Sequence, residues 1–338
     1  MVEPLLPERH PNQELFICDF GEVMPKSDIA SMEHPLFTLS TKPDTTIREY
    51  EHNGTHVTIT PSVLGLATIH DKDILIYCIS QLMAGINRGE KPNRTIRLRA
   101  HDLLVSTNRQ TNGQGYELLK KALKRLKGTV IETNIVTGEQ DRWSVFGILE
   151  KADVVREMNG RMAEIEVQFP EWLYNSVISH SVLTISRDYF RLRKPLERRI
   201  YELARKHCGS KKQWQITIHN LHKKSGSGGH IDKFRYMLKK IEQHDHLPDY
   251  RIEVRDDNVF FLAKNYTDRP EQTDFTRPLI KSDTIEKARK ILGRDYDVYA
   301  IESDWVQWWK DSGEPEFKSP DGAFINFCKR RAGNRTQT

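Results

Sequence analysis

Two helical segments each place several cationic side chains on one face. In the first, predicted over about residues 116–126, the apolar stripe leaves a basic face made of Lys120, Lys121, Lys124 and Arg125. In the second, predicted over about residues 231–244, the face away from the apolar side chains carries Arg235, Tyr236, Lys239 and Lys240. Such groups neutralise phosphates, and near the start of a helix they reach base edges. Both faces are therefore candidate DNA contacts, and the alternative for each is a solvated helix face.

A polar turn precedes each of these helices. The first turn contains Ser106, Thr107, Asn108, Arg109 and Gln110. The second contains Lys223, Lys224, Ser225 and Ser227. Hydroxyl groups, amides and backbone N–H groups at the start of a helix bind phosphate well, so we predict that these residues also contact DNA. The alternative is ordinary turn chemistry with no ligand.

Motifs for catalysis or metal binding are weak in this chain. The glycine-rich SGSGG at 225–229 lacks the Lys-Ser or Lys-Thr of a nucleotide-binding P-loop. The pair His244 and His246 resembles the metal-binding histidines of rolling-circle nickases, but Asp245 separates them and Pro248 follows. The four cysteines form no CxxC pair. We therefore predict a protein that is not an enzyme, with no catalytic residue, no metal and no cofactor.

The elements that must position the basic faces recur along the chain. A helix beginning near Asp71, a strand at 95–98, a short helix at 100–106, the polar turn, the basic helix and a hairpin within 129–149 follow one another. The same order returns in 195–264, and Leu118–Lys121 aligns with Met237–Lys240 at an offset of 119. We interpret this as an internal duplication. Helix, strand, helix, turn, helix and hairpin is the order of a winged helix, whose third helix enters the major groove.

The predicted fold class is α+β, with two tandem winged-helix domains and a small helical C-terminal extension. We expect an extended N-terminal arm over 1–50, a first winged helix over 51–180 and a second over 181–265. A strand at 163–169 is expected to join the two domains. A polar linker at 266–281 then leads to a tryptophan-rich helical module at 282–338. Trp305, Trp308 and Trp309 of that module either close a small core or stack on single-stranded DNA.

Charge is concentrated in two blocks, although the whole chain carries only +5. Residues 97–127 and 187–240 hold most of the excess Lys and Arg, which favours a polyanionic partner. No stretch is long and apolar enough to span a membrane, and no signal peptide is evident, so we expect a cytoplasmic protein without a membrane partner.

Three segments resemble the replication initiator protein A family of plasmids. They are IRLRAHDLLVSTNRQTNGQGYELLKKALKRLKGTVIET, FRLRKPLERRIYELARKHCG and DVYAIESDWVQWWKDSGEPEFKSPDGAFINFC. The resemblance runs in order over about residues 30–330. It implies binding to repeated double-stranded origin DNA (iterons), local melting and recruitment of the host replicative helicase and host initiator. It also implies plasmid copy control through repression of the protein's own gene, often by a homodimer.

Two other functions remain open from the residues. A winged-helix transcriptional repressor or autorepressor would use the same two basic helices, but it would need no additional tryptophan-rich module. A rolling-circle nickase would need a metal-bound histidine pair and a catalytic tyrosine, which the sequence does not assemble. The predicted partners are therefore double-stranded origin DNA, the host helicase and the host initiator, with single-stranded DNA and a second copy of the chain as further candidates.

Overall fold

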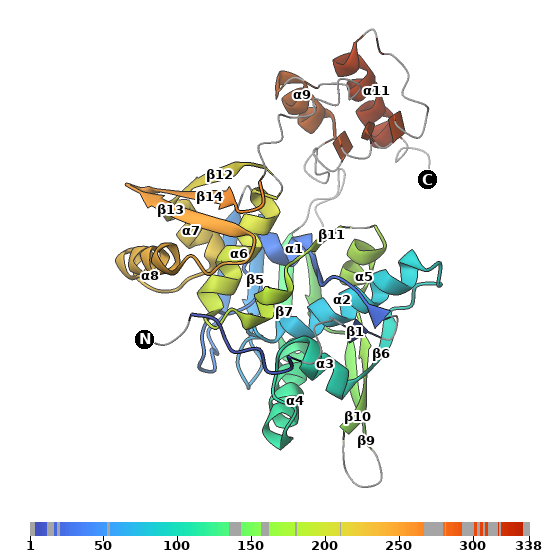
Figure 1. Ribbon diagram of the computed structural model, residues 1–338. Coiled ribbons are helices and arrows are strands. Elements are labelled where there is room, and N and C mark those ends of the chain that lie inside the picture. Colours follow the sequence, from blue (N-terminus) through green and yellow to red (C-terminus); the bar gives the residue numbers. More distant parts are fainter. Residues whose placement is uncertain are drawn as a thin grey trace. The chain divides into compact units, whose positions relative to one another are not determined.

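The computed structural model describes residues 4–11, 17–18, 21–52, 55–134, 143–156, 162–179, 181–209, 211–266, 280, 282–292, 301–302, 305–306, 308–309, 317 and 319–333. The chain forms two compact units (Figure 1). Unit 1 combines Met1–Ile135 with Trp143–Tyr266, and unit 2 combines Val136–Arg142 with Thr267–Thr338. Each unit is described by itself.

The first repeat of unit 1 begins with a buried helix. Helix α2 (Lys72–Asn87) is apolar around most of its circumference, and it is followed by β6 (Thr95–Arg99), α3 (Ala100–Ser106) and α4 (Gly113–Gly128). The repeat ends with an antiparallel hairpin of β9 (Lys151–Arg156) and β10 (Met162–Gln168). Strand β10 also pairs with β6, so the sheet order is β6-β10-β9. Alternate residues of β6 and β10, such as Leu98 and Ile165, are buried beneath the helices.

The second repeat has the same elements in the same order. They are α6 (Pro195–His207), β12 (Gln213–Thr217), α7 (Ile218–Ser225), α8 (Ile231–His244), β13 (Tyr250–Arg255) and β14 (Asn258–Ala263). The sheet order β12-β14-β13 matches that of the first repeat. The agreement in element order and in strand order supports the predicted duplication.

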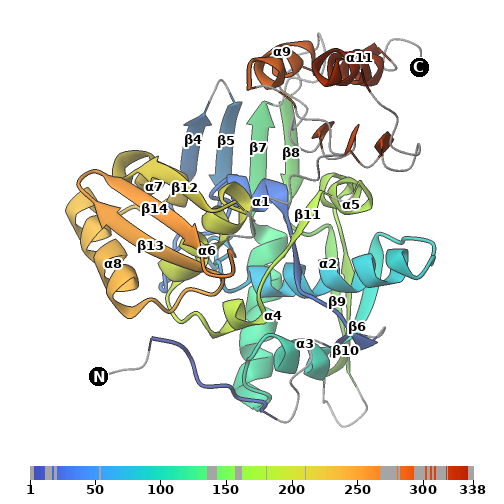
Figure 2. The same cartoon turned by 45° about the horizontal axis from the view of Figure 1, so that its top comes forward.

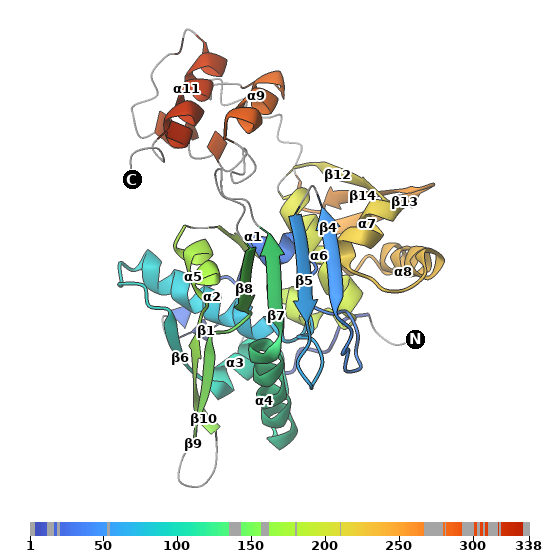
Figure 3. The ribbon, with the colours of Figure 1, turned by 180° about the vertical axis from the view of Figure 1, so that it is seen from behind.

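The predicted hairpin at 129–149 is present, but it does not close the first repeat. Its strands β7 (Val130–Asn134) and β8 (Trp143–Gly147) belong to a separate four-stranded sheet with β4 (Arg48–His52) and β5 (Thr55–Thr60), in the order β4-β5-β7-β8 (Figure 3). The strand at 163–169, expected to join the domains, is instead β10 of the first repeat. The physical reason is the insertion of β7 and β8 between α4 and the hairpin, which the second repeat lacks.

The N-terminal region is more ordered than its prolines predict. Strand β3 (Lys26–Asp28) pairs with β11 (Val182–Thr184), and helix α1 (Ile29–Glu33) follows it. Met32 and Phe37 are buried in the core of unit 1. The expectation of loose packing over 1–50 is therefore wrong for this part, because its short apolar patches fill the space beside α2 and α6. Strands β1 (Ile17–Cys18) and β2 (Gly21–Glu22) form a small ladder of their own.

Shorter elements connect the two repeats. Helix α5 (Glu171–Ile178) follows β10, and the 3-10 helix η1 (Arg187–Arg191) precedes α6. One continuous apolar core runs through both repeats, from α2 and α4 in the first to α6 and α8 in the second. In Figure 2, α8 lies at the left edge of unit 1, whereas α4 runs through its middle.

Unit 2 has its own small core. Helix α9 (Ser282–Leu292) lies where an amphipathic helix was predicted, and α11 (Pro320–Gly333) packs against it. Trp305 is fully buried against Phe317 and Phe324, and Trp309 is also buried, whereas Trp308 is 44% exposed. Trp305 therefore belongs to the core of unit 2, Trp309 is buried, and Trp308 remains at the surface. Among the described residues, no helix has the length and apolarity to cross a membrane.

Candidate nucleic-acid interface

Helix α8 presents the more open of the two basic faces. Phe234, Leu238 and Ile241 anchor it in the core, so the positions between them face outward. Lys239 is exposed, and the ammonium group of Lys240 lies 5.6 Å from the centre of the ring of Tyr236. Tyr236 is itself 62% exposed, which is unusual for a large aromatic side chain. The structure thus brings a cation and an aromatic ring together at the surface of this helix.

Arg235 connects α8 to the hairpin that follows it. Its guanidinium donates to the backbone oxygen of Asp256 at 2.6 Å and to the carboxylate of Asp257 at 2.5 Å. Both acceptors lie in the turn between β13 and β14. This pair fixes the tip of the hairpin beside the basic face, so that the helix and the hairpin share one surface.

The turn before α8 divides its predicted contacts between surface and interior. Lys223 is exposed and Ser227 is partly exposed. The hydroxyl of Ser225 is buried, donating to the backbone oxygen of His222 at 2.8 Å and accepting from the N–H of Ser227. The ammonium group of Lys224 forms an ion pair with Glu33 of α1. Two of the four side chains therefore stabilise the turn itself.

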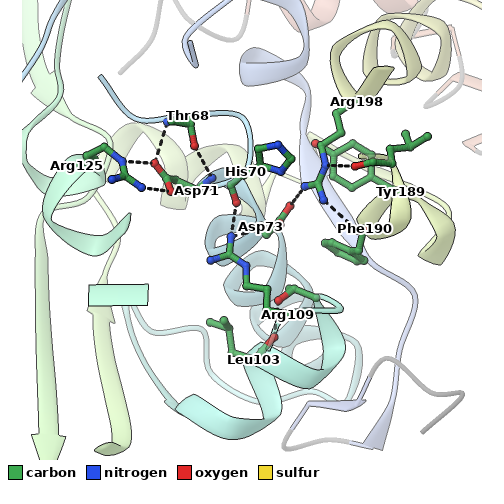
Figure 4. Close-up of polar contacts among 12 residues, drawn as sticks. Thr68, His70, Asp71, Asp73, Leu103, Arg109, Arg125, Tyr189, Phe190 and Arg198 are labelled. Atoms are coloured by element: carbon green, nitrogen blue, oxygen red, sulfur yellow. Dashed lines mark hydrogen bonds and ion pairs between the residues drawn. The ribbon is translucent and has the colours of Figure 1, made fainter. Parts of the chain in front are cut away.

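Helix α4, like α8, combines paired and exposed cations. Lys121 and Lys124 are exposed, and Lys120 pairs with Glu117 one turn earlier. The guanidinium of Arg125 binds both carboxylate oxygens of Asp71, each at 2.7 Å (Figure 4). A bidentate pair of this kind holds the side chain in one geometry. Lys121 and Lys124 are therefore the residues of this face that remain open to a polyanion.

Asp71 immediately precedes α2, but its side chain does not cap the helix. Its carboxylate accepts from the N–H of Thr68 at 2.9 Å and from Arg125. The backbone at Asp71 is already helical, so the carboxylate cannot reach the first free N–H groups. Asp71 instead ties α4 to the segment that precedes α2.

The turn before α4 points mostly inward or toward other segments (Figure 4). Thr107 is buried, and its hydroxyl donates to the backbone oxygen of Leu103 at 2.7 Å. Arg109 donates to the backbone oxygen of His70 and lies 3.3 Å from the carboxylate of Asp73. Ser106 is partly buried, and Gln110 is exposed. Gln110 is therefore the most accessible of the predicted contacts in this turn.

Residues 4–10 lie within the predicted N-terminal arm and are called the arm from here on. They bind this turn, a contact that the sequence did not reveal. Asn108 donates to the backbone oxygen of Pro7 at 3.1 Å and accepts from the N–H of Arg9 at 2.8 Å. Asn108 has a φ of 55°, a left-handed conformation that asparagine tolerates better than most residues. An asparagine in a polar turn was the available signal, but it did not reveal the distant partner.

A charged network at the junction of the two repeats was also missed. Arg198 of α6 donates to the carboxylate of Asp73 of α2 at 2.5 Å, and these side chains are 3% and 2% exposed. Lys72 lies 2.9 Å from the carboxylate of Glu202, and both are buried. Burial and the nearby Arg198 and Arg109 hold the pKa of His70 well below its usual range. The junction is thus polar, fixed and shared by both repeats.

The predicted histidine pair is not arranged around a shared point. His244 is exposed and its Nδ1 lies 2.6 Å from the backbone oxygen of Lys240. His246 is nearly buried, with Nε2 at 3.1 Å from the carboxylate of Glu197. Among the residues that the structure describes, no group of three or more His, Cys, Asp and Glu side chains could hold a metal ion.

Comparisons with known proteins identify relatives of this chain. The family model for replication initiator protein A matches residues 26–252. A putative replication protein of Wigglesworthia glossinidia brevipalpis is 42% identical over 245 residues, which cover 71% of this chain and 89% of the relative.

Solved structures of domains 2 and 3 of RctB share the fold. One superimposes with a TM-score of 0.53 at 12% identity, covering 69% of this chain and 95% of RctB domains 2–3, and a second has a TM-score of 0.50 at 11% identity, covering 70% and 97%. At this identity the likeness concerns the fold alone. The family match and the 42% identical relative show that the chain belongs to the replication initiator protein A family.

Proposed function

We propose that this chain is a plasmid replication initiator that binds repeated double-stranded DNA elements at the origin through two winged-helix modules. The observation that carries the proposal is the recurrence of one unit with one strand order, in which the third helix exposes cations each time. In a winged helix the third helix enters the major groove and the hairpin lies along the backbone. Here α4 with β9–β10 and α8 with β13–β14 take these roles.

The side chains open to DNA differ between the modules. On α8 they are Tyr236, Lys239 and Lys240, with Arg235 beside them bound to the hairpin tip, and on α4 they are Lys121 and Lys124. Two modules in one compact unit can read successive major grooves, so repeats of about 20 base pairs fit the proposal. Membership of the initiator family supports an origin as the place of binding.

Unit 2 is assigned a second role in the same process. Trp308 stands at its surface at 6.0 Å from Phe327, and the guanidinium of Arg331 lies 5.5 Å from the centre of the Phe327 ring. Exposed aromatic rings beside cations stack on unpaired bases. We propose that this surface contacts the melted strand or the host helicase and host initiator. Melting, these partners, a homodimer and a cytoplasmic location belong to this proposal.

The proposed activity is not enzymatic. No nucleotide-binding motif occurs in the sequence, and the two histidines of the candidate nickase pair have different neighbours. Purified protein with Mg²⁺ or Mn²⁺ is expected to leave supercoiled origin DNA uncut. Nicking that disappears in a His244→Ala/His246→Ala variant would establish the opposite.

A transcriptional repressor is the second candidate, because the same two helices would serve it. The separate core of unit 2, built around Trp305, favours the initiator, since repression needs duplex binding alone. A chain ending at residue 266 separates the two functions. As an initiator, the shortened chain binds duplex DNA but does not replicate a plasmid that carries the origin. Normal replication by the shortened chain would contradict the role given to unit 2.

The direct test is footprinting on the DNA that flanks the protein's own gene. Tandem protected segments spaced by about 20 base pairs are expected. The Arg235→Ala/Lys239→Ala/Lys240→Ala variant should lose this protection, while Lys91→Ala, an exposed cation of the α2–β6 loop, should keep it. A wild-type protein that protects no segment under low salt would refute the proposal.

A further inference from the structure

The arm is held in place at two separate points. At the first, the side-chain amide of Asn108 binds the backbone on both sides of Glu8. At the second, the N–H of Leu6 donates to the backbone oxygen of Arg191 at 2.7 Å, and the Arg191 side chain donates back to Leu6 at 3.2 Å. Backbone contacts at Leu6, Pro7 and Arg9 fix the path of the chain, so the Arg9 side chain starts from a defined place beside the start of α4.

A hollow of about 540 Å³ lies between the arm, the turn before α4 and the segment around Lys42. Its cationic lining consists of Arg9, Lys42, Arg109, Arg125 and Arg198, against the carboxylates of Asp71 and Asp73. The net charge of the lining is therefore +3. The three deeper arginines are paired with these carboxylates. Among the described residues, the side chains of Arg9 and Lys42 have no hydrogen-bond or ion-pair partner, and both are exposed at the rim.

The position of this rim relative to α4 matters for a DNA-binding module. In Figures 1, 2 and 3 the arm approaches the start of α4 from the side of the second repeat, whereas the hairpin β9–β10 lies beyond α3 on the other side. A helix in the major groove is flanked by a phosphate backbone on each side. The hairpin can reach one backbone, and the arm is placed to reach the other.

We propose that the arm is a second clamp on the DNA backbone, in which Arg9 and Lys42 bind a phosphate group of the duplex at the rim of the hollow. Asn108 is the positioning residue, since both its side-chain oxygen and its side-chain nitrogen bind the backbone of the arm. The inference rests on the proposed function, because it requires α4 to face DNA. In this inference Asn108 binds the arm instead of contacting a DNA phosphate itself.

The test uses the full chain and a labelled 40-base-pair duplex of mixed sequence, with affinity measured between 50 and 200 mM salt. The Arg9→Ala/Lys42→Ala variant should lower the slope of log K against log salt by about 0.9, because the one phosphate contact that these two side chains share is lost. Lys91→Ala is the matched control for loss of an exposed cation and should leave the slope nearly unchanged. A slope equal to that of the wild type in the double variant would overturn the inference.

Asn108→Gly tests the positioning role, because glycine accepts the left-handed backbone and removes only the amide. Arg9→Ala should weaken binding in the wild type and have little further effect in the Asn108→Gly background, which is the non-additivity expected of coupled residues. Full additivity would overturn the role of Asn108. The Arg235→Ala/Lys239→Ala/Lys240→Ala variant distinguishes failure of the arm inference from failure of the proposed function. If it loses affinity while the arm variants do not, the arm inference alone fails, and if it keeps full affinity, the proposed function fails.

Discussion

The two repeats of unit 1 share their elements and their strand order, but they differ in what surrounds the third helix. In the first, Asp71 holds Arg125 of α4, the arm covers the preceding turn, and an additional sheet is inserted before the hairpin. In the second, α8 keeps Tyr236, Lys239 and Lys240 at the surface, and its hairpin follows after a short connection. The same unit is thus embedded in one copy and open in the other.

This difference suggests a division of labour between the repeats. A side chain that is fixed by an internal ion pair contributes to the stability of the fold and is less available to DNA. Arg109 and Arg125 of the first repeat are held in this way by Asp73 and Asp71, and Arg235 of the second repeat is held by Asp257. Because α8 also exposes Tyr236 beside Lys240, whereas the arm covers the turn before α4, we expect α8 to provide more of the DNA affinity and the first repeat more of the rigidity.

The largest expected effect comes from the ion pair that joins the repeats. Arg198→Ala leaves the buried carboxylate of Asp73 with Arg109 alone, and removal of one partner from a buried pair costs about 3–5 kcal/mol. Urea unfolding followed by circular dichroism measures this loss. Arg97→Ala removes an exposed pair with Glu166 and should cost far less stability. Equal losses in the two variants would show that the junction does not stabilise the body.

The next effect is the pH dependence of the free energy of unfolding, which involves His34 and Glu33. Burial, followed by the cations around it, lowers the pKa of His34 to about 4, although Glu33 opposes this. Between the ordinary value of about 6.5 and 4, the unfolded chain binds a proton that the folded chain does not. The free energy of unfolding should therefore fall as pH drops through this window, by on the order of 3 kcal/mol at most.

Glu33 adds to the loss at lower pH. Burial raises its pKa, but hydrogen bonds and ion pairs with His207, Lys206 and Lys224 of the second repeat lower it overall. A carboxylate with a lowered pKa stabilises the fold above its ordinary value and loses this contribution as pH falls. Unfolding at pH 7.5 and pH 5 measures the histidine part, to which both His34 and His70 contribute. His34→Gln should reduce this difference and the exposed His219→Gln should not. An unchanged pH dependence in His34→Gln would contradict the assignment.

The third effect tests the division of labour directly. Arg235→Ala/Lys239→Ala/Lys240→Ala on α8 should weaken duplex binding at least tenfold and lower the salt slope by about 0.9 for each lost phosphate contact. Lys121→Ala/Lys124→Ala on α4 removes two exposed cations and should have a smaller effect. Fluorescence anisotropy at several salt concentrations compares them. A larger loss in the α4 variant would reverse the roles of the two repeats.

The sequence predicted what depends on local patterning. Helices α3 and α8 and strand β6 lie where apolar periodicity and turn residues placed them, and the aligned Leu118–Lys121 and Met237–Lys240 revealed the repeat. It did not reveal which hairpin pairs with β6, because β7–β8 and β9–β10 have equally good strand patterns and only the long-range register separates them.

The candidate interface was predictable in part for a similar reason. Exposure of Lys121, Lys124 and Lys239 follows from helical periodicity, which the sequence contains. The engagement of Arg125 by Asp71, of Lys224 by Glu33 and of Asn108 by the arm depends on partners 54, 191 and about 100 residues away. A charged residue has the same local pattern whether its partner is a phosphate or a distant carboxylate, so a single sequence cannot distinguish these cases.

The smallest expected effect concerns a glycine that the second repeat does not need. A Cβ at position 115 of α4 would lie 1.8 Å from the backbone oxygen of Gln110, because the turn folds back onto the start of the helix. The aligned position of α8 is Phe234, which is buried in the core. Gly115→Ala must therefore displace the turn, at a cost of about 1–3 kcal/mol. It should also weaken the hold of Asn108 on the arm.

Gly113, two residues earlier in the same helix, is the matched control. A Cβ there would meet no atom within 4 Å, and its φ does not require glycine. Gly113→Ala should leave the fold unchanged or stabilise it by up to about 1 kcal/mol, since alanine loses less backbone entropy in a helix. Thermal or urea unfolding compares the pair. If both variants unfold alike, the turn of the first repeat tolerates displacement, and its close packing against α4 would no longer explain why this copy is the embedded one.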